Sequence, residues 1–145
     1  MIQRYRAFYE GKMYGVKAAI WTSRGLYVTL DEGNKAGRRV RGAVLMQSTG
    51  LFDVNGKEIF EGDVFTCLDD DNNPIYENIV VKFGQHTNMD TVFEREPVYI
   101  GFYAEVQKGT AALDVDIMYN DCEGRLTIIG NIYENPELVE EVLND

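Results

Sequence analysis

Apolar and polar residues alternate along much of the chain, and this period of two predicts half-buried β-strands. The runs with the clearest alternation are 26–30, 79–83, 98–106, 113–119 and 126–132. Turn sequences separate these runs, above all Asn55-Gly56, because both residues tolerate a positive φ and so favour a hairpin. Many short strands at spacings of about 8–12 residues are typical of barrels and sandwiches. We therefore expect a mainly β fold, a small antiparallel β-barrel-like domain.

The carboxy-terminal residues break this pattern and predict a short α-helix. Asn135 is a good N-cap, and Pro136 suits the first helical position, where its missing N–H costs nothing. One apolar stripe follows, made of Leu138, Val139, Val142 and Leu143. A helix of about nine residues is unstable alone in water. We therefore expect it to pack on its own domain or on a neighbouring copy.

Length and composition indicate a single domain that spans residues 1–145. Two polar segments, 31–42 and 84–97, are expected to be long loops. No apolar run reaches the roughly 18 residues of a bilayer span, and the charged amino terminus does not resemble a secretory signal. We therefore expect a cytoplasmic protein.

The two cysteines, Cys67 and Cys122, lie far apart in the sequence. Free cysteine packs as a small hydrophobe, and nothing else in the sequence points to export. We therefore expect both thiols to be reduced and structural, with one disulfide as the alternative.

Charge is unevenly distributed along the chain, whose net charge is −10. Residues 1–41 hold nine Lys or Arg and three Asp or Glu, a net charge of +6, so residues 42–145 carry −16. Such an asymmetry bears on partners rather than on the fold. It can be balanced within the chain, by head-to-tail assembly of copies, or by a polyanion bound to the basic part.

Three segments follow one another in a recognisable order. They are the opening hairpin with Tyr5-Arg6-Ala7-Phe8 and Lys12-Met13-Tyr14, the central segment 45–64 and the carboxy-terminal segment 129–138. Together they resemble the signatures of the YopX family of phage and prophage proteins. The resemblance implies a small β-rich protein that a phage or prophage encodes, located in the bacterial host cell and assembled into oligomers. It implies no activity and no catalytic residues, because the family has no established activity.

The signature segments also have a physical interpretation as turns and caps. Polar side chains stand beside glycines in them, which is how tight turns satisfy their own backbone. Because turn and cap residues recur for backbone reasons alone, we favour this structural role over a ligand site. The structural signature residues are Gln47, Thr49, Gly50, Asn55, Gly56, Glu61, Gly62, Asp63, Gly130, Asn131, Tyr133, Asn135 and Pro136.

The sequence offers little catalytic chemistry. Residues 69–73 begin like a calcium loop, but Pro74 stands where a glycine is needed and Val80 where the last carboxylate ligand belongs. His86 is the only histidine, and it lies in a polar segment without a nucleophile elbow nearby. The cysteines lack the paired spacing of zinc ligands. We therefore expect no metal, no cofactor and no enzymatic activity, with a carboxylate pair in a cleft as the alternative route to catalysis.

Two functions follow from these observations. The leading one is a non-enzymatic accessory protein that acts by protein–protein contact, forms a homo-oligomer and binds a phage or host protein. The alternative is single-stranded nucleic-acid binding by the basic, aromatic amino-terminal part, in which basic side chains follow phosphates and rings stack on bases. The candidate residues for this alternative are Arg38, Arg39, Arg41, Trp21 and Tyr27. The same rings can instead be core residues, with the bases balancing nearby acids.

Overall fold

The computed structural model describes residues 4–33, 36–86, 99–106, 111–114, 118–120, 122–123 and 125–139. Strands dominate these residues, which confirms the predicted mainly β class. The strands are β1 (Tyr5–Tyr9), β2 (Lys12–Thr22), β3 (Gly25–Asp31), β4 (Arg38–Arg41), β5 (Val44–Phe52), β6 (Glu58–Phe60), β7 (Asp63–Leu68), β8 (Pro74–His86), β9 (Tyr99–Val106), β10 (Ala111–Asp114) and β11 (Leu126–Asn131). Within these described residues, no helix has the length and apolar character needed to cross a membrane.

Six antiparallel strands form the first sheet, in the order β4-β3-β2-β1-β5-β6. Glu10 and Gly11 connect β1 to β2, and both have a positive φ, +47° and +82°. The Asn55-Gly56 turn connects β5 to β6, and the N–H of Gly56 donates to the carbonyl oxygen of Asp53 at 3.0 Å. The hairpin predicted from turn chemistry at Asn55-Gly56 is therefore confirmed.

Five antiparallel strands form the second sheet, in the order β10-β9-β8-β7-β11. β8 and β9 pair over a long stretch and form a ribbon. Residues 84–86, predicted as the start of a loop, extend β8, whereas residues 87–97 lie outside the described residues. A register shift between Ile128 and Gly130 interrupts the pairing of β11 with β7.

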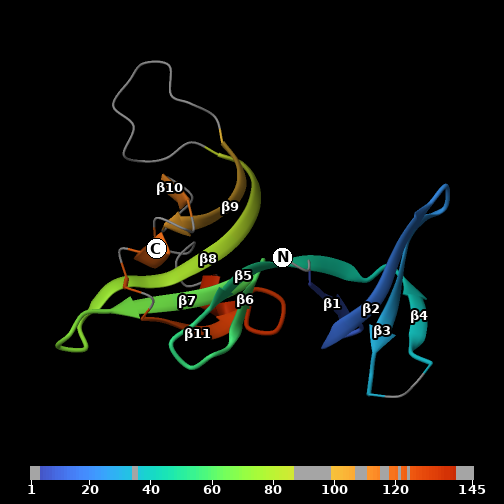
Figure 1. Cartoon of the computed structure of the whole chain (residues 1–145), viewed down its shortest axis with the longest axis horizontal. Coiled ribbons are helices and arrows are strands. Elements are labelled where there is room, and N and C mark those ends of the chain that lie inside the picture. The colour runs from blue at the N-terminus through green and yellow to red at the C-terminus, as the bar shows by residue number, and fades with distance from the viewer. Residues whose placement is uncertain are drawn as a thin grey trace.

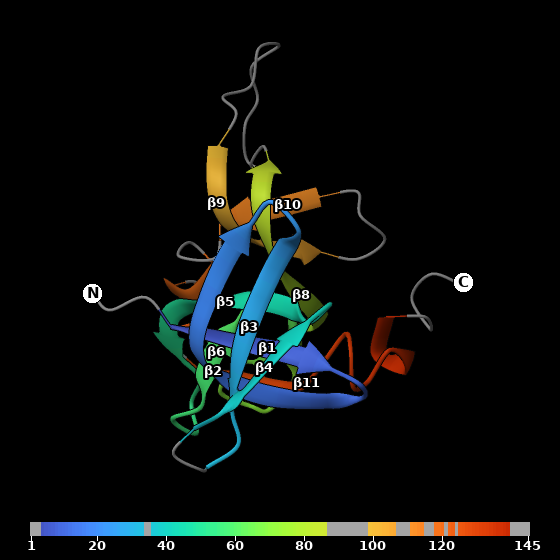
Figure 2. The ribbon, with the colours of Figure 1, turned by 90° about the vertical axis from the view of Figure 1, so that its right-hand side faces the viewer.

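The two sheets are joined by β5. In Figure 1, β2, β3 and β4 lie at one end of the molecule, β8, β9 and β10 lie at the other, and β5 runs between them. Figure 2 looks at the molecule from the end that β2, β3 and β4 occupy. Both sheets are open, with β4 and β6 as the edges of one and β10 and β11 as the edges of the other. The barrel-like closure predicted from the sequence is therefore wrong, because alternation identifies a buried face without showing whether the outermost strands pair with each other.

Two hydrophobic clusters form the core: one lies on the first sheet, and the other joins the second sheet to β6 of the first. The first cluster contains the buried residues Ala7, Val28, Leu30 and Val40. The second contains Ile59, Phe65, Cys67, Ile79, Val81, Ala104, Met118, Cys122 and Leu126. Apolar side chains from the runs 26–30, 79–83, 98–106 and 126–132 thus contribute to these clusters.

Two segments differ from their predicted structure. Residues 38–41, predicted inside a long loop, form β4, which pairs with β3 and buries Val40. Four residues with a single apolar member give too short an alternation to be recognised. Residues 118 and 119, predicted as the end of the strand run 113–119, form a helical turn together with residue 120, and this turn buries Met118.

A disulfide bond joins Cys67 of β7 to Cys122, with the Cα atoms 6.0 Å apart. The prediction of two reduced cysteines is therefore wrong, although both side chains are buried as expected. The chain separation is 55 residues. Cys122 reaches β7 through the helical turn, where its N–H donates to the carbonyl oxygen of Met118 at 3.0 Å. Two cysteines that lie this far apart in the sequence show no local pattern from which their pairing could be predicted.

The predicted carboxy-terminal helix is present as a turn over residues 137–139. The N–H of Leu138 donates to the carbonyl oxygen of Asn135 at 3.1 Å, but the Asn135 side chain does not cap this turn. Its Oδ1 instead accepts a hydrogen bond from the N–H of Asn131 at 3.2 Å. Asn78 Nδ2 donates to the carbonyl oxygen of Leu138 at 3.3 Å, so the turn packs on its own chain. The apolar stripe residues beyond 139 lie outside the described residues.

Candidate functional site

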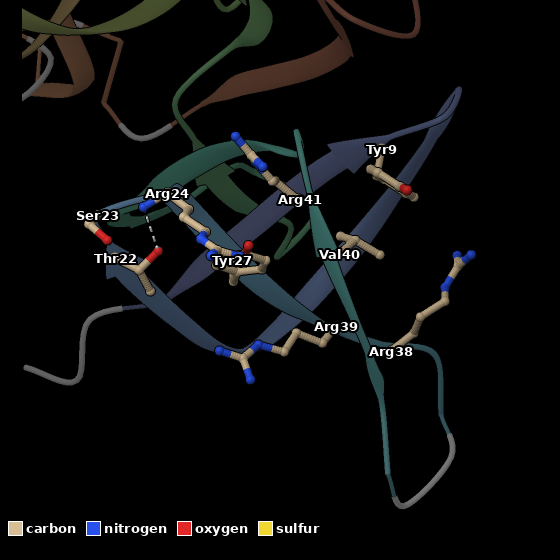
Figure 3. A pocket seen from close by; sticks show the side chains of 9 residues that line it. All are labelled: Tyr9, Thr22, Ser23, Arg24, Tyr27, Arg38, Arg39, Val40 and Arg41. Carbon is tan, nitrogen blue, oxygen red and sulfur yellow. Dashed lines mark hydrogen bonds between the residues drawn. The ribbon is translucent and has the colours of Figure 1, made fainter.

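A basic groove with a volume of about 880 Å³ lies at the edge of the first sheet (Figure 3). The turn between β2 and β3 and all four residues of the edge strand β4 contribute to it. Its lining residues are Tyr9, Thr22, Ser23, Arg24, Tyr27, Arg38, Arg39, Val40 and Arg41. The structure thus brings together four of the five residues that the sequence predicts for nucleic-acid binding. It adds Arg24 and Tyr9, which become neighbours of β4 only through the pairing of the strands.

Alternation along β4 divides its arginines between two faces. Val40 is buried in the first cluster, and Arg38 projects to the same side of the strand (Figure 3). Arg39 and Arg41 project to the other side of the strand (Figure 3), and the pairing of Arg41 with Tyr27 places Tyr27 on that same face. The guanidinium carbon of Arg39 lies 5.1 Å from the centre of the Tyr27 ring, which is within cation–π range. Arg39, Arg41 and Tyr27 therefore form one surface.

Arg38 is already partnered within the chain. Its Nε lies 3.0 Å from Oε1 of Glu32, and this hydrogen bond raises the pKa of Arg38 above its usual value. Its guanidinium carbon also lies 5.6 Å from the Tyr9 ring centre and 5.9 Å from that of Tyr14. Arg38 is thus held by partners within the chain and is less available to a ligand than Arg39 and Arg41.

Trp21, the fifth predicted residue, lies away from the groove. The register between β2 and β3 places Trp21 opposite Leu26 and Ile20 opposite Tyr27, so Trp21 and Tyr27 point to opposite faces. Trp21 is 68% exposed and lines a separate hollow of about 580 Å³, which it shares with Tyr5. The sequence could not separate the two rings because it did not show which face each one occupies.

A second candidate surface lies on the β8–β9 ribbon, which curves away from β7 in Figure 1. Val81 and Ala104 pair in register and are fully buried in the second cluster. Phe83 and Phe102 form the next pair on that face, with ring centres 4.9 Å apart in an edge-to-face contact. Phe83 is 42% exposed, and Ile100, one step further along the same face, is 80% exposed. Apolar side chains thus continue past the core into solvent, and such contiguous patches mark interaction surfaces.

The segment that resembles a calcium loop is held by its own backbone. Oδ1 of Asp69 accepts hydrogen bonds from the N–H groups of Asn73 and Asp71, each at 2.9 Å, and these bonds lower the pKa of Asp69. Asp70 forms an ion pair with Arg125. Across the part of the chain that the structure describes, no three His, Cys, Asp or Glu side chains gather as metal ligands would. The side chain of the only histidine, His86, lies outside that part.

A family model described as YopX protein matches residues 4–140. The chain belongs to the YopX family. A similar solved structure is the crystal structure of protein EF1440 from Enterococcus faecalis, with a TM-score of 0.56 and 24% sequence identity. The match covers 96% of this chain and 99% of that chain, and at this identity it shows the fold alone. No curated protein matches the chain.

The three YopX signature segments meet at the junction between the sheets. Arg6, from the opening hairpin, lies with Nη2 at 2.8 Å from Oδ1 of Asp63, from the central segment, and its guanidinium carbon lies 4.8 Å from the Phe60 ring centre. Phe8 stacks on Tyr133, from the carboxy-terminal segment, with ring centres 5.5 Å apart. Burial raises the pKa of Asp63 and the Arg6 charge opposes this rise; burial also raises the pKa of Tyr133. Arg6 was not among the predicted signature residues, because nothing local shows that it faces Asp63.

Gly62 allows the two YopX sheets to approach closely at this junction. Its N–H donates to the carbonyl oxygen of Val81 at 2.7 Å, and its carbonyl oxygen accepts from the N–H of Ile132 at 2.9 Å. A Cβ at this position would lie 3.2 Å from the Tyr133 ring and 3.3 Å from the sulfur of Met46. With a φ of +90° as well, the position suits glycine for both its space and its backbone.

The other central signature residues connect β5 to β6. The hydroxyl of Thr49 donates to the carbonyl oxygen of Ile59 at 2.8 Å, and the N–H of Glu61 donates to the carbonyl oxygen of Gln47 at 2.9 Å. Gly50 has a φ of +80°, within the region where β5 and β6 lose regular pairing. These contacts are structural.

The Asn55-Gly56 turn is organised by Asp53, a buried residue that the sequence did not single out. Its Oδ1 accepts hydrogen bonds from the N–H groups of Asn55 at 2.9 Å and Lys57 at 2.8 Å. Its Oδ2 accepts from the N–H of Ile128 at 3.1 Å. Asp53 therefore ties this turn to β11.

The carboxy-terminal signature forms a corner between β11 and the helical turn. Oδ1 of Asn131 accepts hydrogen bonds from the N–H groups of Tyr133 at 3.0 Å and of the following residue at 2.8 Å. A Cβ at Gly130 would lie only 2.5 Å from Oδ1 of Asn135. The carbonyl oxygen of Pro136 accepts a hydrogen bond within the helical turn at 3.1 Å. Each of these residues has a role in shaping the corner.

Proposed function

We propose that the protein is a non-enzymatic interaction module that self-associates through the apolar patch of Phe83, Ile100 and Phe102. The observation that carries the proposal is the continuation of a core face into solvent. Exposure along this face rises from 0% at Ala104 to 42% at Phe83 and 80% at Ile100. Complete burial of a Phe or Ile side chain in a contact between two copies contributes about 1.5–3 kcal/mol to association.

A second copy is the occupant that suits this patch best. A two-fold contact brings the same patch of both copies together, so every apolar residue is buried on each side. An apolar patch tolerates this self-pairing, whereas a patch of one charge would repel itself. The basic groove lies on the other sheet, so self-association leaves it accessible.

The buried carboxylates support a binding role over catalysis by an acidic pair. Asp53 is committed to three backbone N–H groups. Asp63 accepts a hydrogen bond from the N–H of Phe60 at 2.7 Å and pairs with Arg6. Both carboxylates thus hold the chain together and neither lines the basic groove. The family assignment further supports a phage or prophage origin and a phage or host protein as an additional partner.

Light scattering coupled to size-exclusion chromatography tests the proposal. The wild-type chain of 16.5 kDa should elute with a mass of at least two copies, and Phe83→Ser combined with Ile100→Ser should reduce it to one. Ile20→Ser is the matched control, because Ile20 is 46% exposed on the first sheet. A wild-type chain that is monomeric at high concentration, or a double variant with unchanged mass, would remove the proposal.

A further inference from the structure

We propose that the basic groove at β4 binds single-stranded nucleic acid. The first reason is the way in which the seven described arginines are partnered. Four of them form ion pairs with acids, namely Arg4, Arg6, Arg38 and Arg125. The other three pair with no acid within the described ranges, and all three line the groove, namely Arg24, Arg39 and Arg41. Guanidinium groups without acidic partners are available for phosphate, which they bind through a planar fork of donors.

The second reason is the surface that Arg39 and Tyr27 form together. Bases of a single strand stack on aromatic rings and on guanidinium planes. Arg39 lies over the Tyr27 ring, so the groove presents a guanidinium group backed by an aromatic ring. Arg41 is two residues away on the same face, about 7 Å along the strand. The groove therefore offers adjacent positions for a base and for phosphates.

The third reason is where the structure places the acidic residues. The acidic excess belongs to residues 42–145, which begin after β4 and build β5 to β11. Residues 1–41 contain Glu10, Asp31 and Glu32, and among the ion pairs of the described residues Glu32 is the one of these three that pairs with a groove arginine, Arg38. None of the three lines the groove. The groove is therefore locally basic although the chain is acidic.

The shape of the groove favours a flexible single strand. It is open along the edge of a sheet, and the four residues of β4 span about 13 Å. A few nucleotides cover that length, and stacking needs bases that are not already paired. The inference is independent of self-association because the β8–β9 patch belongs to the other sheet.

Fluorescence anisotropy with a labelled oligo(dT) of about 20 nucleotides tests this inference, with salt varied between about 25 and 200 mM. Wild-type protein should bind, and its affinity should fall linearly with the logarithm of salt. Arg39→Ala combined with Arg41→Ala should weaken binding by about tenfold or more and reduce the salt slope by about 1.4, because each phosphate contact on a single strand contributes about 0.7. Tyr27→Leu should weaken binding and leave most of the salt slope, because a ring supplies stacking rather than charge.

Arg125→Ala is the matched control, since Arg125 is a partly exposed arginine that directly precedes β11 and is paired with acids. It should bind oligo(dT) like the wild type. Absence of salt-dependent binding at the lowest salt, or equal binding by the Arg39→Ala/Arg41→Ala variant, would overturn the inference. A duplex that competes as well as a single strand would also overturn it. Loss of self-association in that variant would assign the groove to a second copy instead, and unchanged circular dichroism would verify that the variant is folded.

Discussion

The ion pair between Arg6 and Asp63 gives the sharpest prediction about how this fold is held together. Arg6→Met removes the charge and preserves much of the apolar volume. In the folded chain the Asp63 side chain is 1% exposed and that of Arg6 is 11% exposed, so the variant leaves a carboxylate buried without its partner. Removing one partner of a buried ion pair costs about 3–5 kcal/mol.

The small residual exposure of Arg6 places the expected loss near the lower end, at about 3 kcal/mol. For a domain of this size each kcal/mol lowers Tm by about 2–4 °C, so Arg6→Met should lower Tm by about 6–12 °C. Arg4→Met is the matched control, because the Arg4 side chain is 63% exposed in its pair with Glu58. Exposed pairs contribute about 0–1 kcal/mol, so this variant should unfold almost like the wild type.

The loss should also depend on pH in a defined direction. Burial raises the pKa of Asp63 above its ordinary value of 3.8, and Arg6 opposes this rise, so the pKa should rise further in Arg6→Met. Because the pKa of Asp63 is higher in the folded state than in the unfolded state, the stability that its carboxyl group contributes is fully present below the unfolded pKa. This contribution is lost as the pH rises through the folded pKa. The difference between wild type and variant should therefore be small near pH 3.8 and grow as Asp63 ionises.

Urea unfolding followed by circular dichroism from acid to neutral pH measures this difference directly. We expect the free energy of unfolding of Arg6→Met to fall below that of the wild type as pH rises, while Arg4→Met follows the wild type. A loss at neutral pH no larger than that of Arg4→Met would refute the reasoning. A loss independent of pH would also refute it, because the cost would then not come from the charge of Asp63.

Two further predictions concern the disulfide and the carboxy-terminal corner. The Cys67–Cys122 bond closes a loop of 55 residues, and in the chain-entropy account this contributes about 4 kcal/mol to stability. Reductant should therefore lower the Tm of the wild type and leave the Tm of Cys67→Ala/Cys122→Ala unchanged. An equal Tm of the wild type with and without reductant would contradict this. Gly130→Ala places a Cβ against Oδ1 of Asn135 and should lower the free energy of unfolding by about 1–3 kcal/mol, as measured by thermal melts. Gly15→Ala is the control and should lower it much less, because its Cβ would meet its nearest atom at 3.5 Å. Similar Tm values for the two variants would count against the close approach at Gly130.

The strands were predictable where burial alternates over many residues. The run 98–106 predicts which side of β9 faces the core, and the turn at Asn55-Gly56 predicts the hairpin of β5 and β6. Local chemistry decides both features, because alternation and turn preference act over a few residues. The edge strand β4, at residues 38–41, contains one buried apolar residue, so its strand conformation depends on its pairing with β3 rather than on a local pattern.

The remaining features depend on contacts between distant residues. The Arg6–Asp63 pair and the disulfide join segments more than fifty residues apart, and no local pattern records which side chains will meet. The groove shows the same limit. Four of its residues were predicted from the sequence. The placement of Arg38 and Arg39 on opposite faces of β4, and of Trp21 away from the groove, follows from the formation and pairing of the strands.

Sedimentation velocity on the wild-type chain, at low and high salt, most directly tests the claim that the β8–β9 patch mediates self-association. We predict an oligomer that persists at high salt, because burial of Phe83 and Ile100 is apolar, and that disappears in Phe83→Ser/Ile100→Ser. A monomer under all conditions would contradict the claim. An oligomer that dissociates at high salt and ignores the double substitution would contradict it as well, since charge rather than the apolar patch would then join the copies.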